Sequence, residues 1–501
     1  MKITKYLSCL FLAGTLVSCG EDFLNDMPSG TATGEQIADQ ASKDPEKILA
    51  SQISGCYTNW NLNHAMNAGD DINSHQDTGF GGIMLLSDIM SNDISLVMAG
   101  DPWHFDHELA YYAEQYVRAR WPWSFFYTVI SCANDVIAVV DEENTTEAGR
   151  HILGQALAFR GISYAYLAQF YQKTYADGNN KALPCVPIRL TDKETGGVEG
   201  RATVEQVYQR AETDLLRAIG LLEGYKRPDK TTIDQQVAQG LLSRVYLVMN
   251  RWQDAADMAN AARQGYTLNT IEEVQECNYQ NLSDKEVMWG FDVIESNKQI
   301  FASWASWRSV DGPGYAGYEV GAYQLIDARL YNSIPENDVR HYQFVAPDDN
   351  VSIAGNEIPA YASTKFPFVS QWLGDVVYMR VAELYLTEAE ALFRAGNSSG
   401  ANAVMAEFMP NRVLDWTPSL GGFNAETIYL QRRAELWGEG FGYFDCRRLK
   451  QDLVRKYEGT NEAAGMQKNI PYNSYKWTYQ LPLSEIRDND AISSEDQNPL
   501  E

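Results

Sequence analysis

Residues 377–401, VYMRVAELYLTEAEALFRAGNSSGA, carry the pattern that decides the fold. Apolar residues recur there at three- and four-residue spacings, which predicts a helix over Val377–Ala395 with one apolar side. Gly396 then marks a turn, and Ala401 falls where a second helix would pack closely against the first. The apolar side consists of Val381, Leu384, Tyr385, Ala389 and Leu392.

Residues 235–265 repeat this organisation. A first helical segment ends at a turn at Asn250–Arg251, and small residues follow at regular intervals. These offsets match most of a tetratricopeptide repeat, in which small side chains let two antiparallel helices approach closely. Two such units predict a mostly α-helical fold built on a tetratricopeptide-like helical-repeat scaffold. The matching positions are Leu242, Ser243, Tyr246, Ala255, Ala259 and Ala262.

Helical periodicity also predicts a helix over Gln155–Gln172, and Thr203 with Gln206 forms a capping box that opens another helix ending near Leu222. Two segments, about 67–103 and 298–372, have no sustained period and contain several Gly and Pro residues. Long irregular segments between rigid helices often carry function. We therefore expect one domain over residues 36–501, with these two segments inserted as large irregular loops.

The amino terminus has the pattern of an export signal. Lys2 and Lys5 precede an apolar run that is too short to span a bilayer, so we expect residues 1–18 to be removed. Leu16-Val17-Ser18-Cys19 resembles the lipobox of bacterial lipoproteins, in which the cysteine is acylated. This resemblance implies a lipid anchor at Cys19 and a flexible, lipidated tether over residues 19–35. An ordinary signal peptide with an incidental cysteine is the alternative.

Composition excludes several function classes. The formal net charge of −27 argues against binding to nucleic acid, which needs clustered lysine and arginine. The five cysteines after Cys19 are scattered without a CxxC pair, which favours isolated thiols and leaves a disulfide open.

The C-terminal motifs resemble those of the SusD/RagB family of nutrient-binding outer-membrane lipoproteins. Residues 378–391 (YMRVAELYLTEAEA) and 431–448 (QRRAELWGEGFGYFDCRR) are similar to the two strong signatures of that family, and residues 481–486 with 497–499 are similar to its tail. The start of the mature chain, Cys19 to Leu24, is also similar. The tail departs from the family because Leu500-Glu501 follows Asn-Pro, and Cys446 stands where leucine is common.

The resemblance implies a body of four tetratricopeptide-like units with ligand recognition on large loops. It also implies an oligosaccharide ligand, a cell-surface position on the outer membrane, and a partner, a TonB-dependent SusC-like receptor to which the glycan is delivered. A RagB-like protein that captures peptides is an alternative within the same family.

Catalysis is not expected. Glu435, Glu439 and Asp445 could serve as an acid/base pair, but arginines lie close in sequence, which favours a structural ion-pair network. No nucleophile motif, phosphate loop or dinucleotide fingerprint is present. A helical glycoside hydrolase is the enzymatic alternative, although it would need about six similar hairpins. The neighbouring arginines are Arg432, Arg433, Arg447 and Arg448.

Metal sites are only weakly indicated, and we expect no cofactor. His104 and His107 have a spacing that can hold a metal, but exposed polar residues around a helix start explain it better. Asp70-Asp71 and Asp348-Asp349-Asn350 offer oxygen ligands without the alternation of an EF-hand, so structural calcium stays open.

The two irregular segments contain the candidate ligand-binding residues. A sugar has an apolar C–H face and a rim of hydroxyl groups, so aromatic rings with polar neighbours form a suitable platform. One such group lies near residue 103 and the other near residues 304–315, and packing against the helical body is the alternative for each ring. The predicted ligand-binding residues are Asp101, Trp103, Trp304, Trp307, Arg308 and Tyr315.

Overall fold

The computed structural model describes residues 45–62, 75–98, 101–276, 278–418 and 422–500. Residues 49–501 form one compact unit, and the fold given below is that of this unit. The predicted signal segment 1–18, Cys19 and the tether 19–35 lie outside the described residues. Four cysteines, Cys56, Cys132, Cys185 and Cys446, are free thiols.

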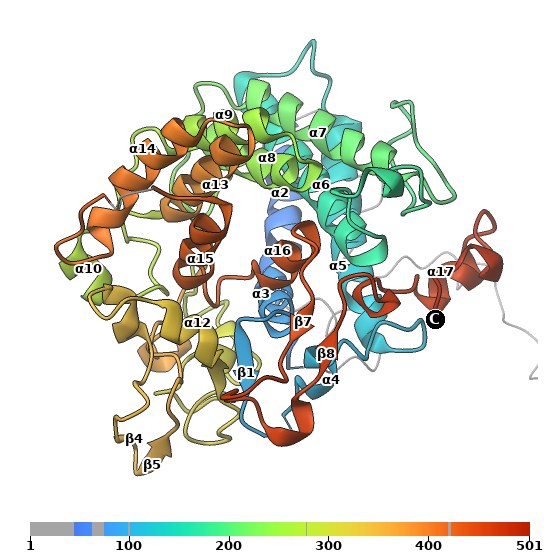
Figure 1. Cartoon of the computed structure of the whole chain (residues 1–501). Coiled ribbons are helices and arrows are strands. Elements are labelled where there is room, and N and C mark those ends of the chain that lie inside the picture. Colours follow the sequence, from blue (N-terminus) through green and yellow to red (C-terminus); the bar gives the residue numbers. More distant parts are fainter. Residues whose placement is uncertain (1–44, 63–74, 99–100, 277, 419–421, 501) are drawn as a thin grey trace, which may run out of the picture. The chain divides into compact units, whose positions relative to one another are not determined.

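Helices dominate the structure and account for about 48% of it, which confirms the prediction of a mostly α-helical fold (Figure 1). None of the described helices combines the length and the apolar character needed to span a membrane. The α-helices are α2 (Pro45–Asn61), α3 (Phe80–Ile89), α4 (His104–His107), α5 (Val117–Val139), α6 (Glu147–Tyr171), α7 (Val204–Leu221), α8 (Gln235–Met249), α9 (Trp252–Arg263), α10 (Ile271–Glu276), α11 (Trp304–Arg308), α12 (Ala328–Ser333), α13 (Val381–Arg394), α14 (Ser398–Phe408), α15 (Ala425–Glu435), α16 (Gly442–Arg448) and α17 (Leu483–Asp488).

Short strands form four antiparallel pairs, each of two strands. The pairs are β1 (Ile94–Leu96) with β3 (Gln324–Ile326), β2 (Val287–Phe291) with β6 (Val376–Arg380), β4 (Val351–Ile353) with β5 (Asn356–Ile358), and β7 (Leu453–Val454) with β8 (Asn469–Ile470).

The helical hairpin over residues 235–263 is confirmed. Helices α8 and α9 are joined at Asn250–Arg251, and Asn250 adopts the left-handed conformation (φ 58°) that ends a helix sharply. Ala255, Ala259 and Ala262 of α9 are fully buried. Their small side chains let α9 pack closely on both α8 and α13.

Helices α6 and α7 also follow the prediction, and they approach one another closely. The capping box is present, because the Thr203 hydroxyl accepts a hydrogen bond from Gln206 N–H and the Gln206 side chain accepts one from Thr203 N–H. A Cβ at Gly161 of α6 would lie 2.9 Å from the carbonyl oxygen of Ala211 in α7. Only glycine therefore permits this helix spacing.

The prediction that the next helix begins at Val377 is wrong. Residues Val376–Arg380 form strand β6, which pairs with β2, and helix α13 begins at Val381. β-Branched Val376 and Val377 suit a strand, and the pairing with a segment about 90 residues earlier in the chain overrides local helical periodicity. Helix α14 follows α13 after Ala395–Asn397, which confirms the second helical hairpin.

Helix α13 is buried along most of its length, and its glutamates are neutralised by arginines from three other elements. Glu383 pairs with Arg244 of α8 at 2.6 Å, and Glu388 pairs with Arg263 of α9 at 2.5 Å. Glu390 pairs with Arg448 of α16 at 2.6 Å. A buried carboxylate needs such a partner because desolvation of an unpaired charge is costly. Each pair therefore fixes the position of one neighbour on α13.

A second buried network joins β2, β6 and α15. Glu435 lies between Arg412 (2.8 Å) and Arg380 (3.1 Å), and Glu286 contacts the same two arginines at 2.8 and 2.6 Å. Glu439 pairs with Arg380 at 2.6 Å. We call these five residues the central ion network. Burial would raise the pKa of Glu435, but the guanidinium groups of Arg412 and Arg380 outweigh burial and hold it well below its ordinary value.

The prediction of a structural ion-pair network over residues 431–448 is confirmed, although some of its partners differ. Asp445 pairs with Arg432 and Arg448, both within the motif, at 2.8 and 2.7 Å. Glu435 and Glu439 instead use basic residues far away in sequence, and Arg433 pairs with Asp93 at 2.6 Å. The spacing of residues within the motif therefore cannot predict these ion-pair partners.

The Glu435→Gln substitution should destabilise the fold by about 3–5 kcal/mol, because it leaves Arg412 and Arg380 buried with one carboxylate fewer. Urea unfolding of both variants at neutral pH measures this effect. Glu426→Gln, an exposed position at the start of the same helix, is the matched control and should cost less than about 1 kcal/mol. Equal losses for the two variants would contradict a structural role for the network.

Candidate functional site

The structure brings the two predicted groups of loop residues together. Trp103 precedes α4, and Trp307 lies in α11. Their ring centroids are 5.5 Å apart with an interplanar angle of 74°, an edge-to-face contact between segments about 200 residues apart in the chain. Both α4 and α11 contact α3, whose ten residues are all buried. Helix α3 is thus the common support of α4 and α11, and the prediction of an irregular loop over residues 67–103 is wrong for Phe80–Ile89, whose apolar residues are buried in a helix.

Aromatic contacts continue beyond Trp307. Its ring stacks on Tyr315 with centroids 3.9 Å apart and nearly parallel planes, and its indole N–H donates to the carbonyl oxygen of His75 at 2.9 Å. Tyr315 in turn contacts Phe301 at 4.7 Å and His75 at 5.8 Å. Three separate segments of the chain therefore meet at Tyr315, which is half-buried.

Three of the four aromatic residues that were predicted to line an open binding platform, all of them tryptophans, are buried. Trp103 has 0% of its surface exposed and Trp307 has 1%, and Trp304 packs edge-to-face on Phe366 at 5.0 Å. Indole rings bury a large apolar area, so packing on α3 and its neighbours gains more free energy than exposure does. Of the six predicted residues, only Tyr315 keeps partial exposure.

The polar members of the predicted set are buried as well. Arg308 donates to Asp88 at 2.5 Å and to the side chain of Gln324 at 2.6 Å, so its role in the structure is an internal ion pair. Asp101 accepts the backbone N–H of Trp103 at 2.8 Å. Its second carboxylate oxygen, Oδ2, and the indole N–H of Trp103 have no hydrogen-bond partner among the described residues. Unpaired buried polar atoms cost about 1–3 kcal/mol each, so this region is not optimised for stability alone.

Exposed aromatic residues lie shortly after Trp103, and they are not among the six residues predicted from the sequence to bind ligand. Phe105 of α4 is 49% exposed, and its ring contacts Tyr111 at 4.9 Å. Tyr111 contacts Tyr116, which is 38% exposed, also at 4.9 Å. The signal was present in the sequence: four aromatic residues, Phe105, Tyr111, Tyr112 and Tyr116, follow Trp103 within thirteen positions.

Together these rings form two groups of ring contacts that only the backbone joins, where His104 follows Trp103 in the chain. Trp307 and Trp103 are buried in the first group, and in the second the ring of His104 lies 5.0 Å from that of Phe105, which reaches solvent. We call the two groups together the aromatic string. Its members are His75, Phe301, Tyr315, Trp307, Trp103, His104, Phe105, Tyr111 and Tyr116.

Charged side chains border the exposed end of the aromatic string. Arg118 lies over the ring of Trp103 at 5.2 Å and pairs with Asp106 at 2.9 Å. Glu108 contacts His104 at 3.5 Å and forms an ion pair with the exposed Lys468. Positively and negatively charged side chains, which can both form hydrogen bonds, therefore lie near the exposed rings.

The histidines of this region do not gather into a metal site. His107 is buried and contacts Glu462 at 2.9 Å, whereas His104 contacts Glu108. Burial, with Arg455 nearby, lowers the pKa of His107 despite its carboxylate partner. Among the described residues, no group of three or more histidine, cysteine, aspartate or glutamate side chains is placed to hold a metal ion.

A separate cleft of about 660 Å³ lies along the 3₁₀ helix η4 (Val339–Gln343). Tyr342, which is 64% exposed, lines it together with Tyr331 and His341. Asp348 and Asp349, which were considered as calcium ligands, also line this cleft. Asp70 and Asp71 lie outside the described residues.

A frame of paired helices with aromatic residues on the irregular segments between them defines a helical-repeat class of protein. Comparison with known families agrees with this class. Residues 85–247 match a family described as starch-binding and associating with the outer membrane, and residues 370–500 match the SusD family. Both of these stretches of the chain are therefore SusD-like.

Solved structures support the same assignment. A SusD-like carbohydrate-binding protein from Bacteroides vulgatus is 25% identical, with a TM-score of 0.76 over 91% of this chain and 98% of that chain. The surface glycan-binding protein A from Bacteroides uniformis shares the fold at 16% identity, with a TM-score of 0.67 over 90% of this chain and 99% of that one. A SusD-like protein from Bacteroides ovatus is 28% identical over 134 residues, which is 26% of this chain and 22% of that protein's length.

The Asp101→Asn substitution should change how stability depends on pH. Burial raises the pKa of Asp101 to about 7, so the folded protein binds this proton more tightly than the unfolded chain does. The free energy of unfolding that the protonated acid contributes is therefore complete below about pH 4 and is lost as the pH rises through about 7. Asparagine keeps an oxygen for the Trp103 N–H and carries no charge. Relative to the wild type, the variant should gain about 2–4 kcal/mol between pH 4.5 and pH 8 in urea unfolding. A difference between the two proteins that does not change with pH would contradict this account of Asp101.

Proposed function

We propose that the protein is a cell-surface glycan-binding lipoprotein that captures oligosaccharides at the exposed end of the aromatic string. The observation that carries this proposal is the row of adjoining rings at Phe105, Tyr111 and Tyr116, two of which are more than one-third exposed. Flat rings match the apolar C–H face of a pyranose at little entropic cost. The neighbouring Glu108 and Lys468 are suited to the hydroxyl rim.

The SusD-like matches support a carbohydrate ligand. One matched family is described as starch-binding, and the Bacteroides vulgatus relative, similar over nearly its whole length, is described as carbohydrate-binding. The chain itself supplies the exposed rings that such a ligand requires. Glycans are therefore the first ligand class to test, and peptides are the competing class.

We further propose that Cys19 is acylated and anchors the protein in the outer membrane, and that a TonB-dependent SusC-like receptor takes up the captured glycan. The export signal and the cysteine that follows it support the anchor. Mass spectrometry of the mature protein tests it: a diacylated Cys19 is expected, and an unmodified amino terminus contradicts it. Purification from solubilised membranes should recover the receptor with the protein.

The proposed role is binding without bond cleavage. Burial would raise the pKa of Glu439, but Arg380 and Lys365 outweigh burial and lower it, so neither Glu439 nor Glu435 is a proton donor near neutral pH. Both acids are held in ion pairs within the helical frame. No enzyme family is among the matched families.

The Phe105→Ala/Tyr111→Ala double variant should lose about 5- to 150-fold in affinity for the glycan that binds wild-type protein, because two stacking surfaces are removed at about 0.5–1.5 kcal/mol each. Isothermal titration calorimetry against a panel of neutral oligosaccharides measures this. The incubated glycan should show no new reducing ends.

Tyr342→Ala is the control, because it removes a ring that is 64% exposed from the separate cleft. Its affinity should equal that of the wild type. If only Tyr342→Ala lost affinity for the glycan, the binding site would lie in the cleft and not at Phe105 and Tyr111. Binding of peptides without binding of any glycan would contradict the proposed carbohydrate ligand.

A further inference from the structure

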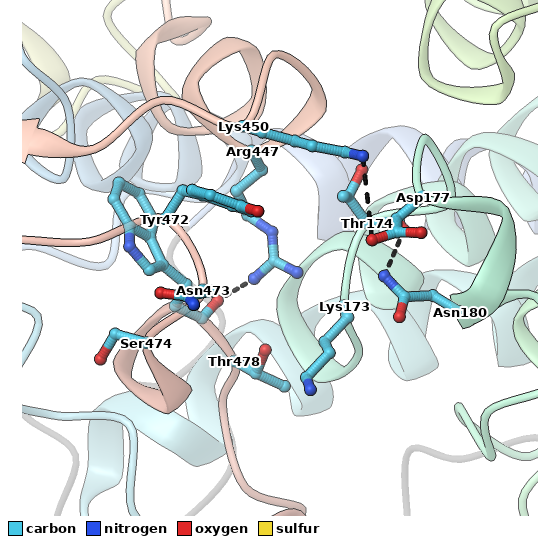
Figure 2. A pocket seen from close by; sticks show the side chains of 11 residues that line it. Lys173, Thr174, Asp177, Asn180, Arg447, Lys450, Tyr472, Asn473, Ser474 and Thr478 are labelled. Carbon is cyan, nitrogen blue, oxygen red and sulfur yellow. Dashed lines mark hydrogen bonds and ion pairs between the residues drawn. The ribbon is translucent and has the colours of Figure 1, made fainter.

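A small pocket of about 140 Å³ lies between two segments that are far apart in sequence (Figure 2). One wall follows the end of α6 and includes the 3₁₀ helix η3 (Gly178–Asn180). The other wall follows the end of α16 and includes residues before, within and after the 3₁₀ helix η8 (Tyr475–Trp477), namely Tyr472, Asn473, Ser474, Trp477 and Thr478. None of the residues of the aromatic string lines this pocket.

Positive charge exceeds negative charge in the pocket. Lys173, Arg447 and Lys450 line it, and Asp177 is the one carboxylate among its lining residues. The whole chain, by contrast, has a formal net charge of −27. A concave site with an excess of positive charge attracts anions against this acidic background.

Arg447 is buried, yet in the described part of the chain every hydrogen-bond acceptor of its guanidinium group is an uncharged oxygen and none is a carboxylate. Its guanidinium donates to the backbone carbonyl oxygens of Gln172 and Trp477, and to the Tyr443 hydroxyl at 2.9 Å. These contacts fix the guanidinium plane and leave its formal charge uncompensated among the described residues. Figure 2 shows the group directed into the pocket. A planar, fixed guanidinium is well suited to bind the oxygens of an anion.

The two lysines are also weakly neutralised. Lys450 lies 3.8 Å from Asp177, at the long end of an ion pair, and both side chains are 37% exposed. Such exposed pairs contribute little, so Lys450 can exchange this partner for a ligand. Lys173 has an exposed side chain, and no carboxylate partner is found for it among the described residues. In Figure 2 its ammonium group points into the same space.

The remaining lining residues fit a sugar ring that carries the anion. Tyr472 is 48% exposed and borders the pocket, so it offers a ring face, and hydroxyl and amide groups from neighbouring positions offer hydrogen bonds. A cavity of about 150 Å³ accepts a six-membered ring such as benzene, so a pocket of about 140 Å³ can hold the ring of one sugar unit while the larger substituents extend toward solvent.

We propose that this pocket binds an acidic sugar unit, a six-membered ring that bears a carboxylate or a sulfate group. The inference deepens the proposed function, because it assumes that the ligand is a glycan. The pocket and the aromatic string are linked by one contact: Tyr112, next to Tyr111, packs edge-to-face on Tyr475 at 5.4 Å, and Tyr475 follows Ser474 of the pocket wall. The protein would then bind an anionic group of the glycan in this pocket, in addition to stacking Phe105 and Tyr111 on its sugar rings.

The test uses the full chain and four probes: D-glucuronate, D-glucose 6-sulfate, D-glucose and inorganic sulfate. By calorimetry at low ionic strength, at least one of the two acidic sugars should bind at least tenfold more tightly than glucose and than sulfate. Which of them binds identifies the anion. Sodium chloride at 0.5 M should weaken this binding severalfold, since exposed charges are screened over a few ångströms.

The Lys173→Gln/Lys450→Gln double variant should reduce affinity for the acidic sugar at least tenfold, and the exposed Lys226→Gln variant should leave it unchanged. Both variants keep the buried Arg447, so the fold is not at risk. The proposal would be overturned if glucose bound as tightly as both acidic sugars, or if inorganic sulfate did. It would also be overturned if the double variant bound the acidic sugar with the affinity of the wild type.

The failure of this inference can be distinguished from failure of the proposed function. Neutral oligosaccharides stack on Phe105 and Tyr111, so their affinity should not change in the lysine variant. Intact neutral-glycan binding with no preference for acidic sugars would reject the pocket alone.

Discussion

The central ion network is the constraint on which the rest of the structure depends. Glu286, Glu435 and Glu439 share Arg380 and Arg412, and all five are buried at the junction of β2, β6 and α15. Several kcal/mol of desolvation per ion is offset only while every partner stays in place. None of these elements can therefore shift independently. Helix α13, which follows β6 directly, is held by the same chemistry through its own three glutamates.

This rigid frame contrasts with the loops that it supports. Helix α3 is fully buried and contacts both α4 and α11, so it fixes where two distant loops meet. In those loops, polar atoms of Asp101 and Trp103 lack partners among the described residues, and rings at Phe105 and Tyr116 stay exposed. Such departures from optimal packing are expected where a surface serves recognition and not stability.

Much of the frame could be predicted from sequence, because its rules are local. The spacing of Ala255, Ala259 and Ala262 and the capping box at Thr203 depend on residues a few positions apart, and the structure confirms them. The start of α13 could not be predicted, since β6 forms only by pairing with distant β2. For the same reason, the sequence located the loops near Trp103 and Trp307 but not the burial of these rings, which arises from packing between distant segments.

The structure of the full chain with a bound oligosaccharide, solved by crystallography or electron microscopy, should show an intact glycan whose sugar rings stack on Phe105 and Tyr111 while the central ion network keeps its contacts. A glycan seated instead against Tyr342 in the separate cleft, or found as cleaved fragments, would contradict this proposed mode of binding.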